Sequence, residues 1–229
     1  MWQISGTQTF LMTQNSYRPP EQFGLFPPVI KHLLIVNVLA FLLQLVGSTS
    51  PSPALSALTN LWLPLYPIGN GFMPWQVITY AFLHGGIGHL FFNMFALWMF
   101  GVQLEMIWGS RRFGIYYFVC VIGAALAQLA TTYGGPPIPT VGASGGVFGI
   151  LLAFGMTFPN QPIYLIFFPV PIKAKWFVLG YGALELFSGV TGTSQGIAHF
   201  AHLGGMVVGF ILLLYWRGQL PIKPEHRIY

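Results

Sequence analysis

Residues 141–149 read V-G-A-S-G-G-V-F-G, a single hydroxyl among glycines at the start of a long apolar run. A serine at the start of a helix usually acts as an N-cap. The same stretch contains G-x-S-x-G, which in soluble hydrolases holds a nucleophilic serine on a strand-to-helix turn. Ser144 is therefore a helix cap, a packing residue or a nucleophile, and the last of these requires a base nearby.

Histidine is the usual base for a serine nucleophile, because its imidazole can take the hydroxyl proton within hydrogen-bond reach. The chain has 6 histidines. Two of them, His32 and His226, fall on the cytoplasmic side of the membrane in the topology derived below. The remaining candidates are His84, His89, His199 and His202.

Two small-residue motifs predict which histidine meets the serine. His202 is followed by a G-x-x-x-G pattern, and the same pattern follows Ser144. The glycines concerned are Gly145, Gly149, Gly205 and Gly209. Small residues at this spacing let two helices approach closely in lipid, so we expect the two segments to dock and to bring hydroxyl and imidazole together. Helix packing without chemistry is the alternative for either motif alone.

Further polar side chains provide candidates for an oxyanion site. His89 and Asn93 are spaced i,i+4 and share a helix face; both donate hydrogen bonds, and with the Ser144 N–H they would stabilise an oxyanion. Polar contacts between helices are their alternative role. His84 is a third donor, a water-positioning group or a loop anchor, and His199, spaced i,i+3 from His202, shares its face.

The acidic residues limit the chemistry. The sequence contains no aspartate, and its glutamates are Glu21, Glu105, Glu185 and Glu225. We therefore expect no carboxylate beside the candidate histidines and a serine–histidine dyad rather than a triad. Glu185 falls within an apolar segment, where structural hydrogen bonding is its expected role. The lack of an H-E-x-x-H motif likewise disfavours a metalloenzyme, although H-x-x-x-x-H and H-x-x-H resemble metal-ligand pairs.

The composition indicates which elements hold these side chains. The chain is 55% hydrophobic and 6% charged, against about 25% charged residues in soluble domains, so it is expected to be an all-α polytopic membrane protein. The net charge of +5 does not indicate a nucleic-acid partner, because the 9 basic residues are scattered. No cofactor is expected. The predicted membrane spans are 29–47, 86–106, 112–132, 144–160, 172–190 and 198–216.

Charge placement predicts the topology. Basic residues precede the first span, lie between spans two and three and between four and five, and follow the sixth; the segments 48–85, 133–143 and 191–197 have none. Basic loops stay cytoplasmic, so the tails 1–28 and 217–229 are predicted to be cytoplasmic, around a domain at 29–216. Segment 48–85 is predicted to lie at the outer membrane interface. Spans two, four and six then begin at the outer face, and their polar residues form one site at one depth.

With these residues assembled, the sequence resembles the rhomboid family of intramembrane serine proteases. The resemblance covers 74–216 and rests on P-W-Q-V-I-T-Y-A-F-L-H-G-G-I-G-H-L-F-F-N at 74–93, E-x-x-x-G-S-x-R-F at 105–113, G-A-S-G at 142–145 and A-H-x-x-G-x-x-x-G at 201–209. It implies a six-helix bundle with Ser144 as nucleophile, His202 as general base, and His89 and Asn93 at the oxyanion. The family pattern often has tyrosine where this chain has Phe148, stacked under the histidine ring.

The resemblance also implies a function. The chain is expected to cleave transmembrane segments of other proteins near the outer leaflet through an acyl-enzyme, in the lipid bilayer of a bacterial cytoplasmic membrane. Substrates with Gly, Pro or polar residues near the outer end of their span are favoured, because such segments unwind more easily. The alternative is an inactive relative that binds transmembrane helices without cutting them. A transporter is disfavoured, since no two-fold repeat is evident.

Overall fold

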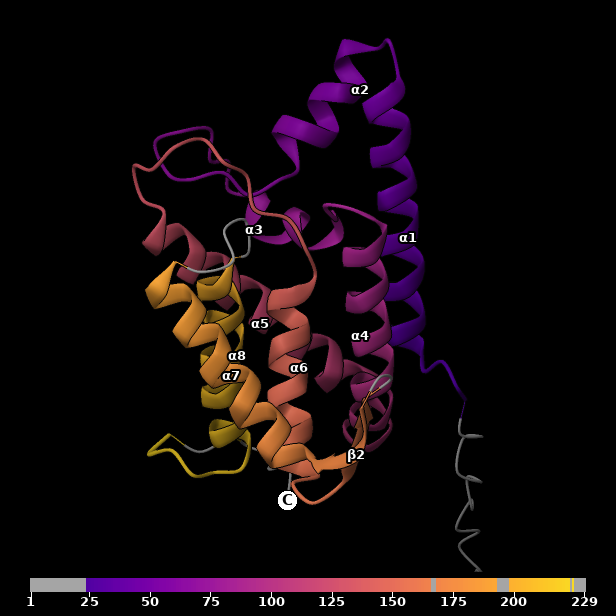
Figure 1. The fold of residues 1–229 in the computed structure, drawn as a ribbon, viewed down its shortest axis with the longest axis vertical. Coiled ribbons are helices and arrows are strands. Elements are labelled where there is room, and N and C mark those ends of the chain that lie inside the picture. Colours follow the sequence, from indigo (N-terminus) through magenta and orange to yellow (C-terminus); the bar gives the residue numbers. More distant parts are fainter. Residues whose placement is uncertain (1–23, 166–167, 193–197, 223, 225–229) are drawn as a thin grey trace, which may run out of the picture.

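The computed structural model describes residues 24–165, 168–192, 198–222 and 224. Residues 1–23 of the first predicted tail, 223 and 225–229 of the second, and 193–197 of the predicted outer loop 191–197 therefore lie outside the described residues. Long helices dominate the rest (Figure 1). They are α1 (Pro28–Thr49), α4 (Ile87–Trp108), α5 (Ser110–Thr131), α6 (Ser144–Thr157), α7 (Ala174–Thr191) and α8 (His199–Trp216).

Each of these helices overlaps one predicted span, but not all of them are long and apolar enough to cross a membrane. Four of them, α1, α4, α5 and α8, are long and apolar enough to do so among the residues searched. Helix α6 has 14 residues and is about 21 Å long at 1.5 Å per residue, less than the hydrocarbon core of about 30 Å. The prediction extended this span to residue 160. That boundary was wrong, because Pro159 disfavours helix at the residue before it.

A β-hairpin was missed between the predicted fourth and fifth spans. Strands β1 (Pro162–Leu165) and β2 (Phe168–Lys173) pair antiparallel, and α7 begins directly after them. The predicted fifth span started at residue 172, inside β2, which corrects that boundary. The segment is rich in β-branched and aromatic residues, which favour strands. Its prolines are tolerated because each strand of a two-stranded hairpin is an edge.

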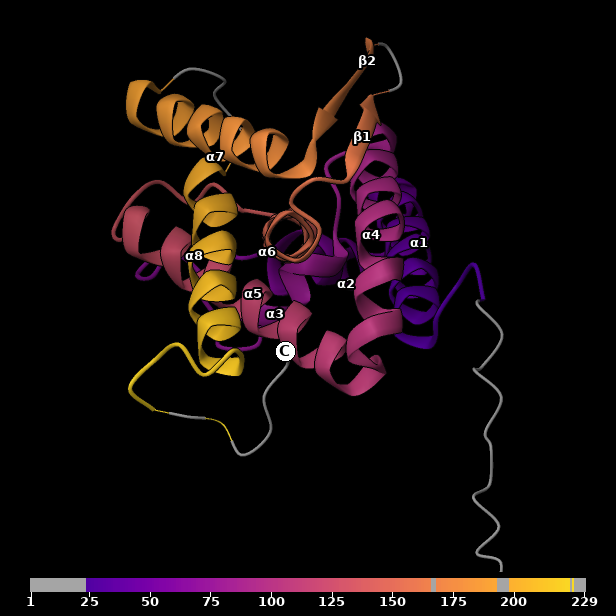
Figure 2. The same ribbon diagram turned by 90° about the horizontal axis from the view of Figure 1, so that it is seen from below.

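Helix α6 lies at the centre of the bundle, seen end-on in Figure 2 with α4, α5, α7 and α8 around it. Glycines set how closely its neighbours approach: a Cβ on Gly205 of α8 would collide with the backbone of Gly145 of α6. Of the glycines predicted to bring the two helices together, Gly145 and Gly205 are therefore in direct contact. The other glycines mostly face α5, Gly149 against Cys120 and Gly209 against Tyr116 and Cys120. The close packing is thus a three-helix contact among α5, α6 and α8.

One end of the bundle collects the basic residues. The amides of Val29 and Ile30 donate to the Glu105 carboxylate at 2.8 and 2.9 Å, which joins the start of α1 to the end of α4. Arg217 donates to the Met156 carbonyl at 3.2 Å, which joins the ends of α8 and α6. These ends lie together at the bottom of Figure 1. The described basic residues at this basic end are Lys31, Arg111, Arg112, Lys173, Lys175 and Arg217.

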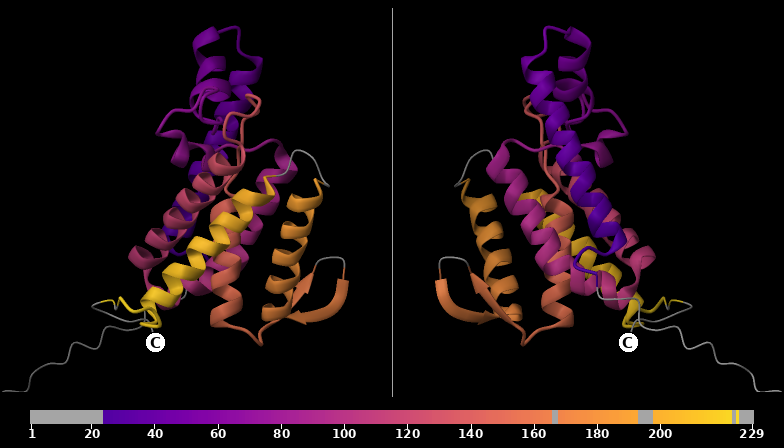
Figure 3. Two further views of the ribbon diagram at one scale, coloured as in Figure 1. Left: turned by 90° about the vertical axis from the view of Figure 1, so that its left-hand side faces the viewer. Right: turned by 90° about the vertical axis from the view of Figure 1, so that its right-hand side faces the viewer.

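The segment 48–85 lies at the opposite end, beside the top of α1 (Figures 1 and 3). Backbone hydrogen bonds between Leu65 and Thr140, 3.0 and 2.8 Å long, pin it to the connection before α6. The buried Gln76 accepts hydrogen bonds from backbone amides of the same segment. Trp62 and Trp75 stack on each other and remain exposed. The helical elements of this segment are α2 (Pro53–Ala57), η1 (Leu58–Trp62), α3 (Gln76–Thr79) and η2 (Tyr80–Phe82).

Candidate active site

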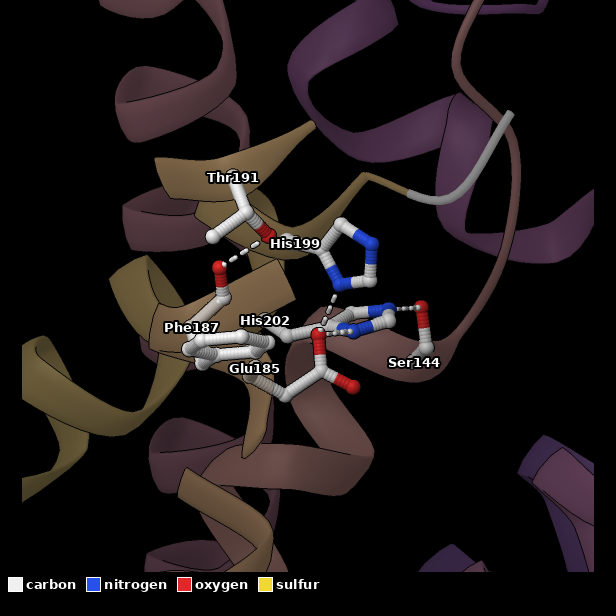
Figure 4. Close-up of polar contacts among 6 residues, drawn as sticks. All are labelled: Ser144, Glu185, Phe187, Thr191, His199 and His202. Atoms are coloured by element: carbon white, nitrogen blue, oxygen red, sulfur yellow. Dashed lines mark hydrogen bonds and ion pairs between the residues drawn. The ribbon is translucent and has the colours of Figure 1, made fainter. Parts of the chain in front are cut away.

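Ser144 and His202 come together where α6 and α8 begin. Ser144 is the first residue of α6 and His202 lies in the first turn of α8. The Ser144 Oγ is 2.7 Å from His202 Nε2 (Figure 4). Ala143 is the N-cap residue of α6, and no side-chain hydrogen bond from a described residue caps this helix. The serine hydroxyl is therefore directed at the imidazole and not at the helix backbone.

Phe148 lies under the imidazole of His202. The two rings are stacked, with centroids 4.2 Å apart and planes inclined by 7°. Phe148 is one turn after Ser144 on α6, so the helix that presents the hydroxyl also supports the ring that faces it. The stacking limits rotation of the imidazole about its Cβ–Cγ bond and so keeps Nε2 directed at the serine.

A carboxylate lies on the other side of the same imidazole, which corrects the expectation that none would be near the histidines. The Glu185 Oε2 is 2.9 Å from His202 Nδ1 and 2.6 Å from His199 Nδ1. All three side chains are buried. Figure 4 shows the carboxylate of α7 between the two rings of α8. The sequence signal was an acidic residue within an apolar span, which marks a functional group with a partner by default.

The position of His89 fits a hydrogen-bond donor aimed at the serine. Its Nδ1 is 3.3 Å from the backbone amide of Gly85, which donates to it. Because Nδ1 accepts, the ring proton is on Nε2. A Cβ on Gly142 would lie 3.0 Å from this Nε2 and 3.5 Å from the Ser144 Oγ, so both side chains border the space that the absent Gly142 side chain leaves. Asn93 is buried one turn later, and its amide donates to the His89 carbonyl at 2.9 Å.

His84 lies behind this group. Gln44 of α1 holds its backbone, accepting from the His84 amide at 2.9 Å and donating to its carbonyl at 3.3 Å. The His84 ring meets the His89 ring edge-on, with centroids 5.1 Å apart. Burial, with a smaller contribution from His89, lowers the pKa of His84 to about 4, so this ring is neutral at neutral pH. Of the roles considered for His84, the geometry favours that of a loop anchor.

A cavity of about 1420 Å³ connects the polar groups. Ser144, His202, Glu185, His89 and Asn93 all line it, whereas His84 and His199 do not. Its walls include aromatic residues of α4 and α7, residues of the connection before α6, and Tyr164 of β1. The volume exceeds the 300–1,000 Å³ or so of small-molecule sites and suits a stretch of polypeptide.

A model of the rhomboid domain matches residues 71–219, about two thirds of the chain, including Ser144, His202, Glu185, His89 and Asn93. The chain belongs to the rhomboid family. With its apolar helices, this identifies an integral membrane protein.

Among similar proteins, Rhomboid protease GluP of Bacillus subtilis is 30% identical over 187 residues, 80% of this rhomboid and 34% of the relative. Rhomboid protein 1, mitochondrial, of Saccharomyces cerevisiae is 33% identical over 168 residues, 67% and 45% of the two chains. Rhomboid-like protease 3 of Toxoplasma gondii is 25% identical over 195 residues, 84% and 71%. The match thus spans between a third and a half of the first two relatives.

Among the described residues of this rhomboid, one group has the composition of a metal site: Glu185, His199 and His202, whose ligand atoms lie within 4.8 Å of one another. The contacts of 2.6 and 2.9 Å to the carboxylate are hydrogen-bond distances. Ligands about 2.0–2.1 Å from a tetrahedral zinc ion would stand about 3.3 Å apart. The three side chains are therefore arranged as a hydrogen-bonded cluster, with His202 Nε2 left to the serine.

Proposed function

We propose that this rhomboid is an intramembrane serine endopeptidase that cleaves transmembrane segments near the outer leaflet through an acyl-enzyme. The observation that carries the proposal is the 2.7 Å contact between Ser144 Oγ and His202 Nε2, two residues that line the large cavity. A serine with a hydrogen-bonded base is the arrangement that activates a weak nucleophile. Two relatives, named as a rhomboid protease and a rhomboid-like protease, support the same class of reaction.

The acylation step follows from the contacts. His202 Nε2 takes the hydroxyl proton as Ser144 Oγ bonds to the carbonyl carbon of the substrate, which becomes a tetrahedral oxyanion. The Ser144 amide, His89 Nε2–H and Asn93 Nδ2–H are the proposed donors to that oxyanion. The peptide C–N bond then breaks, and the imidazolium returns its proton to the departing amine. Water attacks the acyl-enzyme by the same route and releases the carboxylate product.

Substrate entry is proposed to occur between α4 and α7, since both helices contribute walls of the cavity. A transmembrane helix shields its peptide bonds by internal hydrogen bonds. The cleaved segment must therefore unwind before its carbonyl can reach Ser144. Glycine, proline or polar residues near the outer end of a span lower this cost, so transmembrane proteins with such residues are the proposed substrates.

The membrane arrangement is also part of the proposal. Six crossings with both termini in the cytoplasm agree with the collection of basic residues at one end of the bundle. A bacterial cytoplasmic membrane is the proposed location, and the similar proteins include both a Bacillus and a mitochondrial member.

The second candidate function is binding of transmembrane helices without cleavage. The large cavity would serve either function, but a binding protein has no need for a serine hydroxyl hydrogen-bonded to an imidazole. The geometry of Ser144 and His202 therefore favours the protease.

Fluorophosphonate labelling distinguishes the two functions. Purified wild-type protein in detergent is expected to form a covalent adduct, and Ser144→Ala to form none, because the probe reacts with an activated serine. The same pair of proteins is then tested for cleavage of a transmembrane substrate in liposomes, with and without a chelator. Equal labelling of the two proteins, or loss of cleavage on chelation, contradicts the serine mechanism.

A further inference from the structure

We propose that Glu185 is a positioning residue that extends the dyad to a Ser144–His202–Glu185 array, with His199 fixing the carboxylate; this rests on the proposed function. A carboxylate removed from water is costly unless it is paired and hydrogen-bonded. Here one oxygen, Oε2, lies 2.6 Å from the Nδ1 atom of His199 and 2.9 Å from the Nδ1 atom of His202. These two hydrogen bonds offset the cost of burying Glu185, and the one to His202 orients the proposed base.

With Glu185 ionised, the contacts assign the proton of neutral His202 to Nδ1. An ionised carboxylate oxygen only accepts hydrogen bonds. His202 Nδ1, 2.9 Å from Oε2, therefore carries the hydrogen. In the neutral ring this leaves a lone pair on Nε2, the atom 2.7 Å from the Ser144 hydroxyl. The other tautomer, with hydrogen on Nε2, cannot take the serine proton. Glu185 thus selects the tautomer that acts as a base, the role that the third residue of a serine triad performs.

Glu185 also favours the state that follows proton transfer. Once His202 has taken the serine proton, a full positive charge lies 2.9 Å from the carboxylate. The attraction between these charges is greater away from bulk water, because the local dielectric constant is lower. No proton moves to Glu185 in this step; the imidazolium keeps both hydrogens until it protonates the amine. The effect is on the chemical step and not on substrate binding.

His199 holds the carboxylate from the side away from the cavity. Its Nδ1 is 2.6 Å from Oε2, and it does not line the cavity. One turn of α8 therefore presents two imidazoles to one oxygen of α7. Removing His199 leaves the Glu185–His202 contact possible but less constrained, so the expected loss of activity is smaller than for Glu185.

A purely structural role would be to tie α7 to α8, and the experiment must separate this from positioning. Glu185→Gln keeps the size and hydrogen-bonding capacity of the side chain and removes its charge. The full-length protein in liposomes is expected to lose about 10²- to 10⁴-fold in kcat with KM unchanged, by analogy with amide substitution in a soluble triad. His199→Gln is expected to lose less. Thermal unfolding of Glu185→Gln is expected within a few degrees of wild type.

Glu105→Gln is the matched control. Glu105 is also buried and fully hydrogen-bonded, but it lies at the basic end, bound to the start of α1 and to Ser110. This variant is expected to unfold at lower temperature and to keep the wild-type kcat. Ser144→Ala must be inactive in the same assay; if it is as active as wild type, the proposed function fails, and not only the role of Glu185.

The tautomer itself is measured by ¹⁵N NMR of histidine-labelled protein, with the His202 signals assigned by their loss in His202→Ala. Wild type is expected to carry hydrogen on Nδ1. Hydrogen on Nε2 overturns the proposal, and this measurement does not require Glu185→Gln to fold. A kcat within threefold of wild type in folded Glu185→Gln also overturns it. The proposal is also overturned if Glu185→Gln loses activity only to the extent that it unfolds and the tautomer of His202 is the same as in wild type.

Discussion

Gly142 determines how near His89 approaches the serine. Its φ is +133°, in the region that favours glycine, and a Cβ there would lie 2.8 Å from His89 Cε1. Any side chain at this position would displace the imidazole from the space beside Ser144. The glycines around the hydroxyl are therefore not interchangeable: Gly142 makes room for a hydrogen-bond donor, and Gly145 makes room for Ala124 of α5.

Asn93 provides a test of the proposed oxyanion site at the residue scale. Asn93→Ala is expected to lower kcat about 10²- to 10³-fold, because removal of one oxyanion donor costs about 2.7–4 kcal/mol of activation free energy. Cleavage of a transmembrane peptide in detergent measures the rate. The thermal unfolding midpoint serves as control and should change little, since among the described residues the Asn93 amide donates only to the His89 carbonyl of its own helix turn. An unchanged kcat removes Asn93 from the proposed machinery.

The residue types of the site were readable from the sequence, but one pairing was not. Serine, histidine and glycine spacings predicted that Ser144 and His202 would meet, because the first glycine of each G-x-x-x-G motif lies at the contact of α6 with α8. Glu185 is not part of such a motif. The direction of its side chain depends on how α7 packs against the bundle, and few side chains of α7 fix that packing. Among the residues of α7, all of them described, those buried are Ala174, Val178, Glu185 and Ser188.

At the scale of elements, the contact of α6 with α8 positions nucleophile and base. Gly205, three residues after His202, lies against the backbone of Gly145, which directly follows Ser144. Gly205→Ala is expected to separate the helix starts, to abolish fluorophosphonate labelling and to destabilise the fold by about 1–3 kcal/mol, typical of overpacking.

The control for this substitution is Gly180→Ala. Gly180 is within α7, with no neighbour within 4 Å of an added Cβ. The alanine there should leave labelling unchanged and stabilise the helix by about 0.5–1 kcal/mol. Normal labelling of Gly205→Ala would mean that the two helices do not need this contact to align the site.

Element boundaries were predicted less well than element positions. Hydropathy located the long helices, because apolar runs are their main signal. It did not detect that Pro159 ends α6 or that 162–173 forms a hairpin, since a short apolar run fits a strand or a helix equally well. Both misses lie at the basic end, away from the site, and leave the proposed chemistry unaffected.

At the scale of the whole molecule, the two ends of the bundle differ in charge, which makes the topology testable. The protein has a single cysteine, Cys120, which is buried. In a Cys120→Ala background, Tyr133→Cys in the connection before α6 is expected to react with an impermeant maleimide in intact cells. Arg112→Cys at the basic end is expected to react only after permeabilisation, because basic loops stay cytoplasmic. The reverse pattern would put the site at the cytoplasmic leaflet.

The nucleophile, the base and the carboxylate lie on three separate helices, and one of these, α7, runs along the outside of the bundle (Figure 3). If a substrate enters by pushing α7 aside, Glu185 leaves with it and His202 loses the partner that orients it. The proposed protease would then be inactive while its entrance is open, and would become fully reactive only when α7 closes over a bound segment. Such a coupling would prevent cleavage of other transmembrane proteins that enter the cavity briefly but do not remain bound.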